Sequence, residues 1–315
     1  MQTQTLQVVS REELVPGVVS LRLASPQGAP LPEWTAGAHI DLHLDPPENP
    51  GLVRQYSLCG DPSDSAIYRI AVLAEADGAG SRYVYETVRT GQLIQVSEPR
   101  DQFSFRHHER VTLIAGGIGI TPILPMVHAA AAAGVDWRLH YAGRSRDSMP
   151  FLQELAEYGD RVQVHISAEG SRMDVHNVVN GTLSEVIYAC GPARLLDELE
   201  DVTQKADGVS LRVERFVNEN TVDNVGDHTF VVECELSGKT LEVPPGRSIL
   251  KVAEENGIAV PSSCQGGTCG TCETFVVEGE PDHRDAILNA QEREESEVMM
   301  VCVSRCKGTR LKLEL

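Results

Sequence analysis

The stretch of sequence that decides the fold is SSCQGGTCGTCETF, residues 262–275. Its cysteines, Cys264, Cys269 and Cys272, could bind a metal, close a disulfide or act as free thiols. The N-terminal run MQTQTLQVVSREEL has neither the basic nor the apolar segment of a secretory signal, so we expect a cytoplasmic protein. Because the cytoplasm keeps thiols reduced, a disulfide is not expected, and metal binding is the first hypothesis to test.

The spacing of these cysteines favours one kind of metal centre. The order C-x4-C-x2-C followed by a distant cysteine is the plant-type ligand pattern of a [2Fe–2S] cluster, and Cys302 supplies the distant position. Zinc sites usually pair two C-x2-C knuckles or add histidines, whereas here only Cys269 and Cys272 form such a pair. Cys306 is an alternative fourth ligand. We favour Cys302, because it is expected inside the apolar strand MMVCVSRC, with Cys306 near the end. We therefore predict one [2Fe–2S] cluster on Cys264, Cys269, Cys272 and Cys302.

Glycines surround the same cysteines. Gly266, Gly267 and Gly270 have no Cβ, so the loop can take conformations that are closed to other residues. We expect this freedom to let backbone N–H groups approach the cluster sulfurs closely.

Length and charge limit the remaining possibilities. A chain of 315 residues and 34.3 kDa is too long for one ordinary core, so two or three domains are expected. The net charge of −19 argues against nucleic acid, because neutralising phosphates needs a basic face. No apolar run approaches the roughly 20 residues that cross a bilayer, so no membrane is expected. The acidity favours solubility or a basic protein partner.

The pattern of apolar residues divides the chain. Up to residue 104, short alternating runs such as 39–44 and 68–75 are separated by Pro, Gly and Asp, which is typical of a small antiparallel β-barrel. From about residue 109, strands alternate with helices, which predicts a parallel sheet with ligands at the carboxyl ends of its strands. After the polar run 217–227, hairpin strands, a short helix and the cysteine loop predict a small α+β domain.

A second constellation begins with RQYSL, residues 54–58. The phenol of Tyr56 could lie against a flat conjugated ring, and Ser57 could hydrogen-bond to that ring. Arg54 could supply a charge-assisted bond to a phosphate.

The run GAGSRYV, residues 78–84, provides the matching phosphate site. Gly80 and Ser81 stand where a helix starts, and free N–H groups at a helix N-terminus suit a phosphate, with Arg82 as a second candidate cation. A phosphate site beside a site for a flat ring indicates a flavin.

A third constellation is AGGIGITP, residues 115–122, which follows the first strand of the α/β region. The spacing G-x-G-x-x-G is absent, but a strand followed by glycines and a helix N-terminus is the arrangement that lets a pyrophosphate approach the backbone. CGP, residues 190–192, ends another strand of the same sheet and is expected to face the same crevice.

These motifs, in this order, make the chain resemble the phthalate dioxygenase reductase family, the reductases of Rieske-type aromatic oxygenases and O-demethylases within the ferredoxin–NADP reductase superfamily. The resemblance covers nearly the whole chain. It implies a multidomain fold: an antiparallel β-barrel flavin domain (1–104), an α/β parallel-sheet nicotinamide domain (105–218), a linker (219–227) and an α+β β-grasp ferredoxin domain (228–315).

The resemblance also implies site residues. Residues that contact FMN are expected at Arg54, Gln55, Tyr56, Ser57, Ala71, Val72, Gly80, Ser81, Arg82 and Phe216. Residues that bind NADH are expected at Gly116, Gly117, Gly119, Thr121, Arg144, Cys190, Gly191 and Pro192. Ser57, near flavin N5, and Cys190, near the nicotinamide ring, are the expected catalytic residues. Arg144 and Arg146 could accept a 2′-phosphate, but Asp147 and the family's habit favour NADH over NADPH.

The implied function is electron transfer from NADH through FMN and the [2Fe–2S] cluster to a separate Rieske-type oxygenase. A hydride carries two electrons and the cluster takes one at a time, which explains why a flavin shares the chain, and no acid–base residue is required. One alternative is a self-contained flavin/iron–sulfur oxidoreductase that acts directly on a small organic substrate. Another is an electron carrier or zinc-binding module without enzymatic activity. A monomer is expected.

Overall fold

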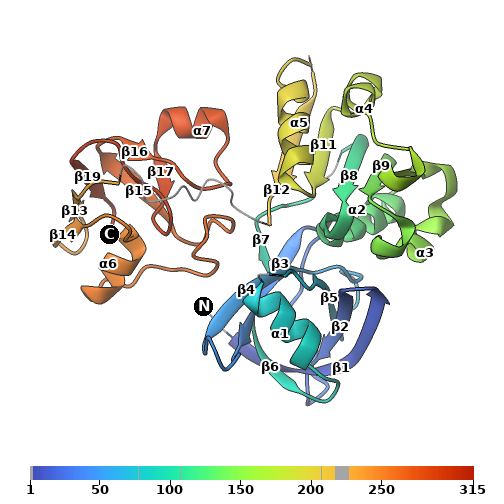
Figure 1. Cartoon of the computed structure of the whole chain (residues 1–315), viewed down its shortest axis with the longest axis horizontal. Helices are drawn as coiled ribbons and strands as arrows, with labels where there is room; N and C mark the ends of the chain where they lie inside the picture. Colours follow the sequence, from blue (N-terminus) through green and yellow to red (C-terminus); the bar gives the residue numbers. More distant parts are fainter. Residues whose placement is uncertain (1–2, 77, 107, 207, 217–226) are drawn as a thin grey trace. The chain divides into compact units, whose positions relative to one another are not determined.

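The computed structural model describes residues 3–76, 78–106, 108–206, 208–216 and 227–315, which fall into two compact units, Met1–Glu214 and Arg215–Leu315 (Figure 1). The expected fold classes are confirmed: an antiparallel barrel, a parallel sheet and a mixed sheet follow one another along the chain. Of the predicted linker 219–227, only Asp227 lies within the described residues. The predicted domain bounds stay predictions.

The first part of unit one is the barrel. Its elements are β1 (Thr3–Val15), β2 (Val18–Ala24), β3 (Ala38–Leu44), β4 (Leu52–Ser57), β5 (Tyr68–Leu73), α1 (Ala79–Thr87), β6 (Leu93–Ser97) and β7 (Arg100–Asp101). The strand order is β4-β3-β6-β1-β2-β5, with β7 beside β3. The edge strands β4 and β5 approach through an isolated bridge between Leu58 and Ile70, so the sheet curls toward closure.

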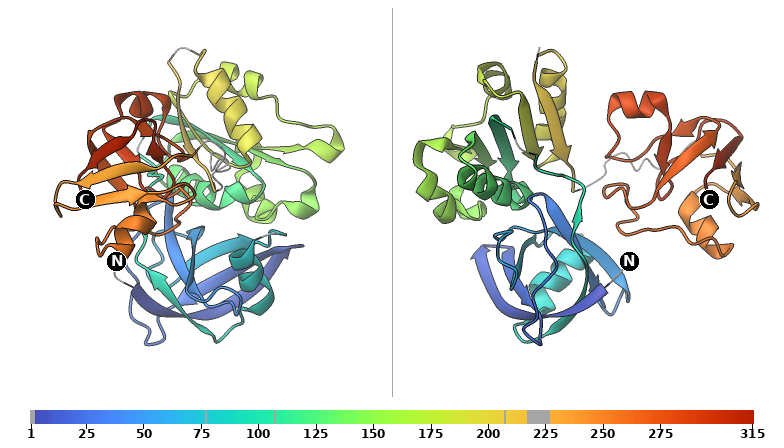
Figure 2. Two further views of the ribbon diagram at one scale, coloured as in Figure 1. Left: turned by 60° about the vertical axis from the view of Figure 1, so that its left-hand side comes forward. Right: turned by 180° about the vertical axis from the view of Figure 1, so that it is seen from behind.

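Alternation along the strands builds the barrel core. Leu21, Ile40 and Val96 are fully buried, whereas Leu93 and Gln95 on β6 face solvent. Helix α1 packs against the barrel through the fully buried Val84 and Val88 (Figure 2). The helix therefore presents its first turn beside strand β4, where the candidate flavin residues begin.

The second part of unit one is the parallel sheet. Its principal elements are β8 (Arg110–Gly116), α2 (Ile120–Ala132), β9 (Asp136–Gly143), α3 (Leu152–Leu155), β10 (Val162–Ile166), α4 (Val175–Gly181), β11 (Val186–Cys190), α5 (Ala193–Thr203) and β12 (Ser210–Glu214). The strand order is β10-β9-β8-β11-β12, so the chain reverses direction of travel across the sheet between β10 and β11. Ligands bind at such a switch point, beyond the carboxyl ends of the strands.

Both faces of the parallel sheet are covered. Leu113 packs with α2, while the adjacent Ile114 packs with α4 and α5 on the opposite face. Barrel residues Cys59 and Phe103 belong to the same core as α2, and Arg69 of the barrel pairs with Glu154 of α3 at 2.9 Å. The barrel keeps its own core but also contributes residues to the core on the α2 face of the parallel sheet, which joins the two sheets in one compact unit.

Unit two is the mixed α+β sheet. Its elements are β13 (Phe230–Cys234), β14 (Thr240–Val243), α6 (Ile249–Glu255), β15 (Glu273–Glu278), β16 (Pro281–Asp282), α7 (Ala290–Glu295), β17 (Val298–Met300), β18 (Arg305–Cys306) and β19 (Arg310–Leu313). The order of the main sheet is β14-β13-β19-β15-β17, with β13 and β19 parallel.

One local expectation about unit two is wrong. The run MMVCVSRC was expected to form one strand with Cys302 inside it, but β17 ends at Met300 and Cys302 lies in a turn. The carbonyl of Met300 accepts hydrogen bonds from the backbone N–H groups of Val303 and Ser304, which closes the turn before β18 begins. The apolar pattern alone cannot distinguish a buried turn from a buried strand.

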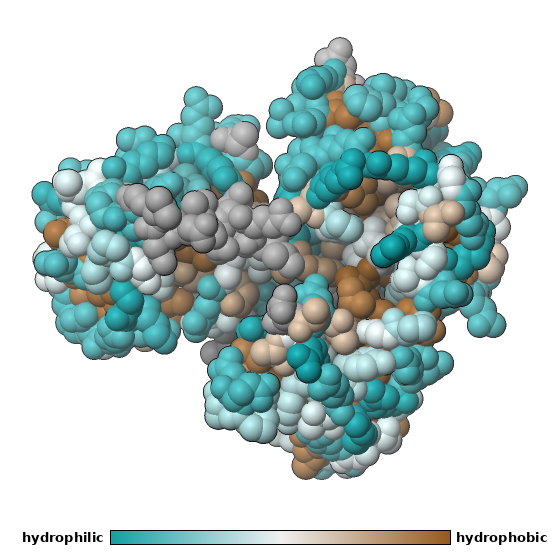
Figure 3. Space-filling model, viewed as in Figure 1, coloured by the Kyte–Doolittle hydropathy of each residue, from teal (hydrophilic) through white to brown (hydrophobic). Residues whose placement is uncertain are grey.

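Hydrophilic side chains cover most of the molecular face that is visible in Figure 3, as the acidic composition leads one to expect. Among the helices of the described residues, none combines the length and the apolar character needed to cross a bilayer.

Candidate redox site

The predicted flavin residues gather where β4 meets α1. Helix α1 begins after Gly78, which offers no side-chain cap, so among the described residues no capping side chain satisfies the N–H groups of its first turn. A Cβ on Gly80 would lie 2.6 Å from Cγ of Arg54, so the arginine stem crosses the first turn of the helix. This arrangement puts the stem of an arginine beside an uncapped helix N-terminus, which is a suitable place for a phosphate. The guanidinium itself donates to the carbonyl of Val53 at 2.9 Å.

The other two side chains predicted to contact the phosphate, Ser81 and Arg82, make hydrogen bonds or ion pairs within the protein. The Ser81 hydroxyl donates to the carbonyl of Gly78 at 3.2 Å and accepts from the backbone N–H of Glu75, which fixes the loop before the helix. Arg82 pairs with Glu86 at 3.3 Å and lines a surface pocket of about 400 Å³ that Arg54 and Tyr56 do not line. Of the two candidate arginines, Arg54 is the better placed.

The strand opposite β4 offers backbone groups. Ala71 and Val72 are buried on β5, and their partners on one side are Ser20 and Val19 of β2. On the other edge of β5, the segment after β4 pairs with Arg69 and Ile70, and no strand of the described residues is paired with Ala71 and Val72 on that side. They can therefore bond a ring edge, as the resemblance implies.

Ser57 and Cys190 are brought together with a carboxylate that the sequence analysis did not identify. The Ser57 hydroxyl donates a long hydrogen bond of 3.5 Å to Oε2 of Glu214, the last residue of β12. Glu214 is paired in register with Cys190 at the end of β11, and the side chain of Cys190 is fully buried. The three residues thus come from the barrel and from adjacent strands of the parallel sheet.

Burial controls the protonation of this trio. It raises the pKa of Glu214 to about 8, although the Ser57 hydrogen bond acts in the opposite direction. Burial, reinforced by Glu214, raises the pKa of the Cys190 thiol well above its usual value. At neutral pH both groups are therefore protonated. The position of Glu214 in VERF, two residues before the predicted flavin contact Phe216, is the sequence signal that could have indicated it.

Phe216 itself follows β12 and has a side chain that is 42% exposed. It belongs to the second unit, so its packing on the flavin stays a prediction.

The glycines of AGGIGITP have two different roles. A Cβ on Gly119 would lie 2.4 Å from the carbonyl oxygen of Cys190, and one on Gly116 would lie 2.6 Å from Cδ of Pro192. Both glycines therefore let the ends of β8 and β11 pack closely. Gly117 has a positive φ of 53° and open space at its Cβ position, so it is free to face a ligand.

Thr121 lies away from that open space. It is buried, and its hydroxyl donates to the carbonyl of Ile118 at 3.0 Å, so the structure gives it a role in shaping the turn. It is not among the residues lining the pocket described next, and the expectation of a direct dinucleotide contact from it finds no geometric support.

A pocket of about 550 Å³ opens at the carboxyl edge of the parallel sheet. Its lining combines predicted residues with cationic and hydroxyl side chains from all the neighbouring loops: Gly116, Gly117, Ala142, Gly143, Arg144, Ser148, His165, Ser167, Arg172, Met173, Val175, Pro192, Arg194, Leu195 and Glu198. The sequence analysis missed Arg172 and Arg194, because nothing in their local sequence shows that distant loops converge here. The pocket size and the cations suit a dinucleotide.

The four predicted cysteine ligands converge in unit two. Cys264 is in hydrogen-bonding contact with Cys269 and Cys302, and Cys272 is in contact with Cys302. These contacts lower the pKa of Cys264 and raise the pKa of Cys269 and Cys302. Cys306 stands apart, with its thiol donating to the carbonyl of Arg310 at 3.4 Å. The geometry therefore favours Cys302 over Cys306 as the fourth ligand, although the strand argument for that choice was wrong.

The loop backbone is shaped around the sulfurs. The N–H groups of Gly266 and Thr268 point to Sγ of Cys264 at 3.3 and 3.4 Å. Gly267 and Gly270 adopt positive φ angles of 73° and 69°, and Gln265 does so at 51°. Buried thiols that receive backbone N–H groups suit an anionic iron–sulfur cluster.

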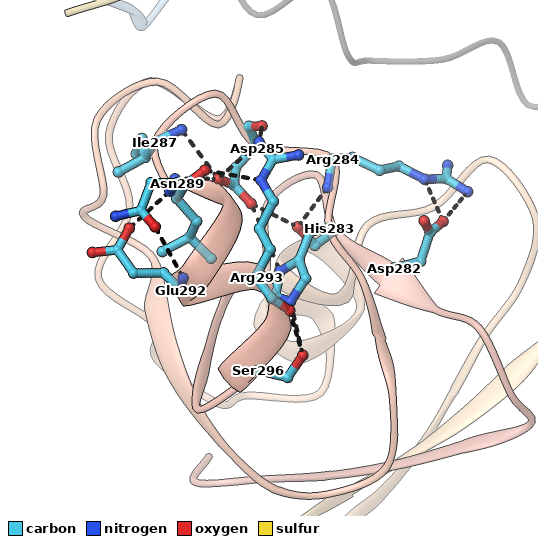
Figure 4. Close-up of polar contacts among 11 residues, drawn as sticks. Asp282, His283, Arg284, Asp285, Ile287, Asn289, Glu292, Arg293 and Ser296 are labelled. Atoms are coloured by element: carbon cyan, nitrogen blue, oxygen red, sulfur yellow. Dashed lines mark hydrogen bonds and ion pairs between the residues drawn. The ribbon is translucent and has the colours of Figure 1, made fainter. Parts of the chain in front are cut away.

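Figure 4 shows the polar contacts of the segment 282–296, which is hydrogen-bonded to this loop. The Asp285 carboxylate is fully buried and accepts the backbone N–H groups of Ile287 and Leu288 at 3.1 and 2.8 Å. The next N–H in the segment, that of Ala286, donates to the carbonyl of Gly267 in the cysteine loop at 2.9 Å. Asp285 therefore orders the backbone that contacts the loop.

Fold and site together define a class: a flavin- and nicotinamide-dependent iron–sulfur oxidoreductase. The family model described as "2Fe-2S iron-sulfur cluster binding domain" matches residues 232–307. The chain is 38% identical to phenoxybenzoate dioxygenase subunit beta of Ectopseudomonas oleovorans, over 95% of this chain and 93% of that one.

Two solved structures are also similar. Phthalate dioxygenase reductase is 35% identical, with a TM-score of 0.73 over 99% of this chain and 98% of the other. An intact type IV self-sufficient cytochrome P450 monooxygenase is 37% identical, with a TM-score of 0.87 over 99% of this chain, which spans only 41% of that protein. The chain belongs to the phthalate dioxygenase reductase-like family of flavin reductases with a C-terminal [2Fe–2S] domain, the reductase components of oxygenase systems. The expected enzyme class is confirmed at this level.

Proposed function

We propose that this protein takes electrons from a reduced nicotinamide dinucleotide, for which the sequence predicts NADH, and delivers them through FMN and one [2Fe–2S] cluster to a Rieske-type oxygenase. The observation that carries this proposal is the meeting of Ser57, Cys190 and Glu214, in a chain that also has an uncapped helix N-terminus beside β4 and brings four cysteines together. The flavin supplies the conversion of two-electron chemistry into the one-electron steps that an iron–sulfur cluster accepts.

The chain's own residues position that chemistry. Arg54 and the N–H groups at the start of α1 hold a phosphate, as the resemblance implies for FMN. Tyr56 and Ser57 contact the flavin ring, the edge of β5 bonds its pyrimidine side, and Phe216 packs on it.

The dinucleotide is held at the carboxyl edge of the parallel sheet. Gly117 and the lining of the pocket receive the dinucleotide, and Cys190 lies near its nicotinamide end. Glu214, protonated below about pH 8, presents a neutral carboxyl to Ser57, so no buried negative charge opposes a hydride passing this point.

The second unit is the exit of the electron path. Cys264, Cys269, Cys272 and Cys302 hold the cluster, and the N–H groups around Cys264 stabilise its negative charge. The domain bounds 1–104, 105–218 and 228–315, with a linker at 219–227, form part of this proposal, as do a monomeric state and a cytoplasmic location. The four cysteines outside the proposed cluster, Cys59, Cys190, Cys234 and Cys306, are free thiols, which supports that location.

The direct test is spectroscopy of the purified protein, followed by turnover with ferricyanide. Flavin and iron–sulfur absorption bands, FMN as the extracted flavin, and NADH oxidation are the expected results. Protein that carries neither band and oxidises no reduced nicotinamide would refute the proposal. Reduction of a small organic compound without any partner protein would instead favour the self-contained oxidoreductase.

A second candidate acceptor is a haem oxygenase. The observation in its favour is the TM-score of 0.87 to a self-sufficient cytochrome P450 monooxygenase, whose own chain contains the matching region. Product formation by a Rieske-type oxygenase and by a cytochrome P450, each supplied with this protein and a reduced nicotinamide, separates the two. Turnover only with the cytochrome P450 would replace the Rieske-type partner.

A further inference from the structure

The side of the parallel sheet that faces α4 changes character from its centre to its edge. Over β8 and β11 this side is apolar, and Ile114 and Ile187 pack there with residues of α4 and α5. Over β9 and β10 the strand register puts polar residues on the same side: Arg138, His140, Gln163 and His165. Strands of a parallel sheet usually carry apolar residues on both faces, because helices cover them. The polar half of this face is therefore not built for helix packing.

A second pocket of about 550 Å³ lies over these polar residues, and we call it the sheet-face pocket. Arg110, Asp136 and Ser184 line it where β8, β9 and β11 begin, at the edge of the sheet opposite to the dinucleotide pocket. Among the described residues, the two pockets have only His165 and Arg172 in common. The sheet-face pocket is therefore a separate site.

Two histidines form a polar pair in this pocket. Nδ1 of His140 lies 3.2 Å from Nε2 of His165, and the two rings are stacked. Burial lowers the pKa of His140 to about 4 and also lowers the pKa of His165, so both rings are neutral at pH 7. A neutral imidazole has one N–H and one acceptor nitrogen, so the hydrogen-bonded pair keeps one N–H donor and one acceptor. The pair can therefore donate one hydrogen bond to a ligand.

The cation that defines the charge of the ligand is Arg138. Of the other arginines in the lining, Arg110 pairs with Asp136 at 2.9 Å and Arg172 lies 3.9 Å from Glu198. Arg138 forms no ion pair within the described residues, although the chain has a net charge of −19. A guanidinium with free donors can bind a carboxylate through two parallel hydrogen bonds. The pocket is therefore suited to an anion.

The rest of the lining adds an apolar edge and no free carboxylate. Asp174 caps α4 by accepting the backbone N–H of Asn177 at 3.0 Å, so its charge is used within the protein. Val178 of α4 and Leu183, whose side chain is 76% exposed, line the pocket on the helix side. Small-molecule sites combine such apolar walls with a few placed polar groups. The chemistry of the lining matches a carboxylate on an apolar body.

We propose that the sheet-face pocket binds a small organic acid. The carboxylate lies at Arg138 and the pair His140–His165, and the apolar body packs against Val178 and Leu183. This site goes beyond the proposed function, because it needs neither the flavin nor the cluster and lies apart from the dinucleotide pocket.

The test is calorimetric titration of the holo-protein with benzoate, which combines one carboxylate with an apolar ring. We expect one benzoate to bind per chain, and Arg138→Ala to weaken its binding about tenfold through the loss of a charge-assisted hydrogen bond. Two matched controls should keep the parent affinity. Arg212→Ala removes an exposed arginine of β12 that lines neither pocket, and Arg144→Ala removes one from the dinucleotide pocket.

Two further probes test the class of ligand. Benzyl alcohol lacks the charge and inorganic phosphate lacks the apolar body, so each should bind about tenfold more weakly than benzoate. The proposal is overturned by unchanged benzoate affinity in Arg138→Ala, by loss of binding in Arg144→Ala instead, or by phosphate binding as tightly as benzoate. Absence of benzoate binding up to about 10 mM also rejects the site, while NADH oxidation by the same preparation leaves the proposed function standing.

Discussion

At the scale of single residues, Glu214 combines an unusual environment with a central position. Its carboxyl ends β12, accepts a hydrogen bond from Ser57 and stands in register with Cys190. Burial makes this carboxyl costly to ionise, so Glu214 keeps its proton to a higher pH in the folded protein than in the unfolded chain. Ser57 and Cys190 could be predicted because each belongs to a short motif. Glu214 could not, because it follows Cys190 by 24 residues (214 − 190) and lies next to it only when β11 and β12 pair.

The raised pKa of Glu214 has a consequence for stability against pH. Between the usual value of 4.5 and the folded value of about 8, the carboxyl is ionised in the unfolded chain but protonated in the fold. Unfolding therefore releases a proton, and each pH unit in this window lowers the free energy of unfolding by at most about 1.4 kcal/mol.

The prediction is that Glu214→Gln removes this contribution. The melting temperature of the variant minus that of the parent protein should increase from pH 6 to pH 8.5, as measured by thermal unfolding in matched buffers. An unchanged difference between variant and parent across this range would show that the carboxyl titrates normally.

At the scale of elements, the ends of β8 and β11 are the tightest junction of the parallel sheet. A side chain at Gly119 would overlap the backbone of Cys190, which no rotamer change can relieve. We expect Gly119→Ala to lower the free energy of unfolding by about 1–3 kcal/mol in urea titrations.

Gly181→Ala is the control, because no atom lies within 4 Å of its Cβ position and its φ is not positive. It should stay within about 1 kcal/mol, on the stabilising side. Equal effects of the two changes would contradict the packing role.

The segment behind the cysteine loop is a second element whose role can be measured. Asp285→Ala leaves the N–H groups of Ile287 and Leu288 without their acceptor, at a cost of about 1–3 kcal/mol for each buried donor. We expect the variant to lose iron during gel filtration and its cluster bands to bleach at lower temperature. Asp282→Ala removes a partly exposed ion pair with Arg284 and should keep its iron. Full iron retention by Asp285→Ala would show that the cysteine loop keeps its conformation without Asp285.

At the scale of the whole molecule, the sequence predicted the order of the sheets, and the four cysteines that it selected lie together in the fold. Cysteine spacing and glycine-rich turns are local signals, so they can be identified in the sequence without a structure. The pocket arginines could not be found in this way, because Arg172 and Arg194 belong to loops that the fold alone brings to Arg144. The strand expected around Cys302 was wrong for a different reason. The apolar pattern shows that the segment is buried, but burial does not determine whether a segment is a strand or a turn.

The choice of fourth ligand separates the two cysteines near the end of the chain. Cys302 touches Cys264 and Cys272, whereas Cys306 bonds the carbonyl of Arg310. We expect Cys302→Ser to lose the cluster bands and Cys306→Ser to keep them, as read by absorption and iron content. The reverse pattern would assign the ligand to Cys306.

The central claim is the order of the electron path, with the flavin before the cluster, and Cys272→Ser tests it most directly. The variant is assayed in folded, flavin-replete form with NADH and, in parallel, ferricyanide and cytochrome c as acceptors. Ferricyanide reduction should largely survive, because it needs only the first unit, while cytochrome c reduction should be lost with the cluster. Loss of both activities in such a preparation, or retention of both, would contradict this order.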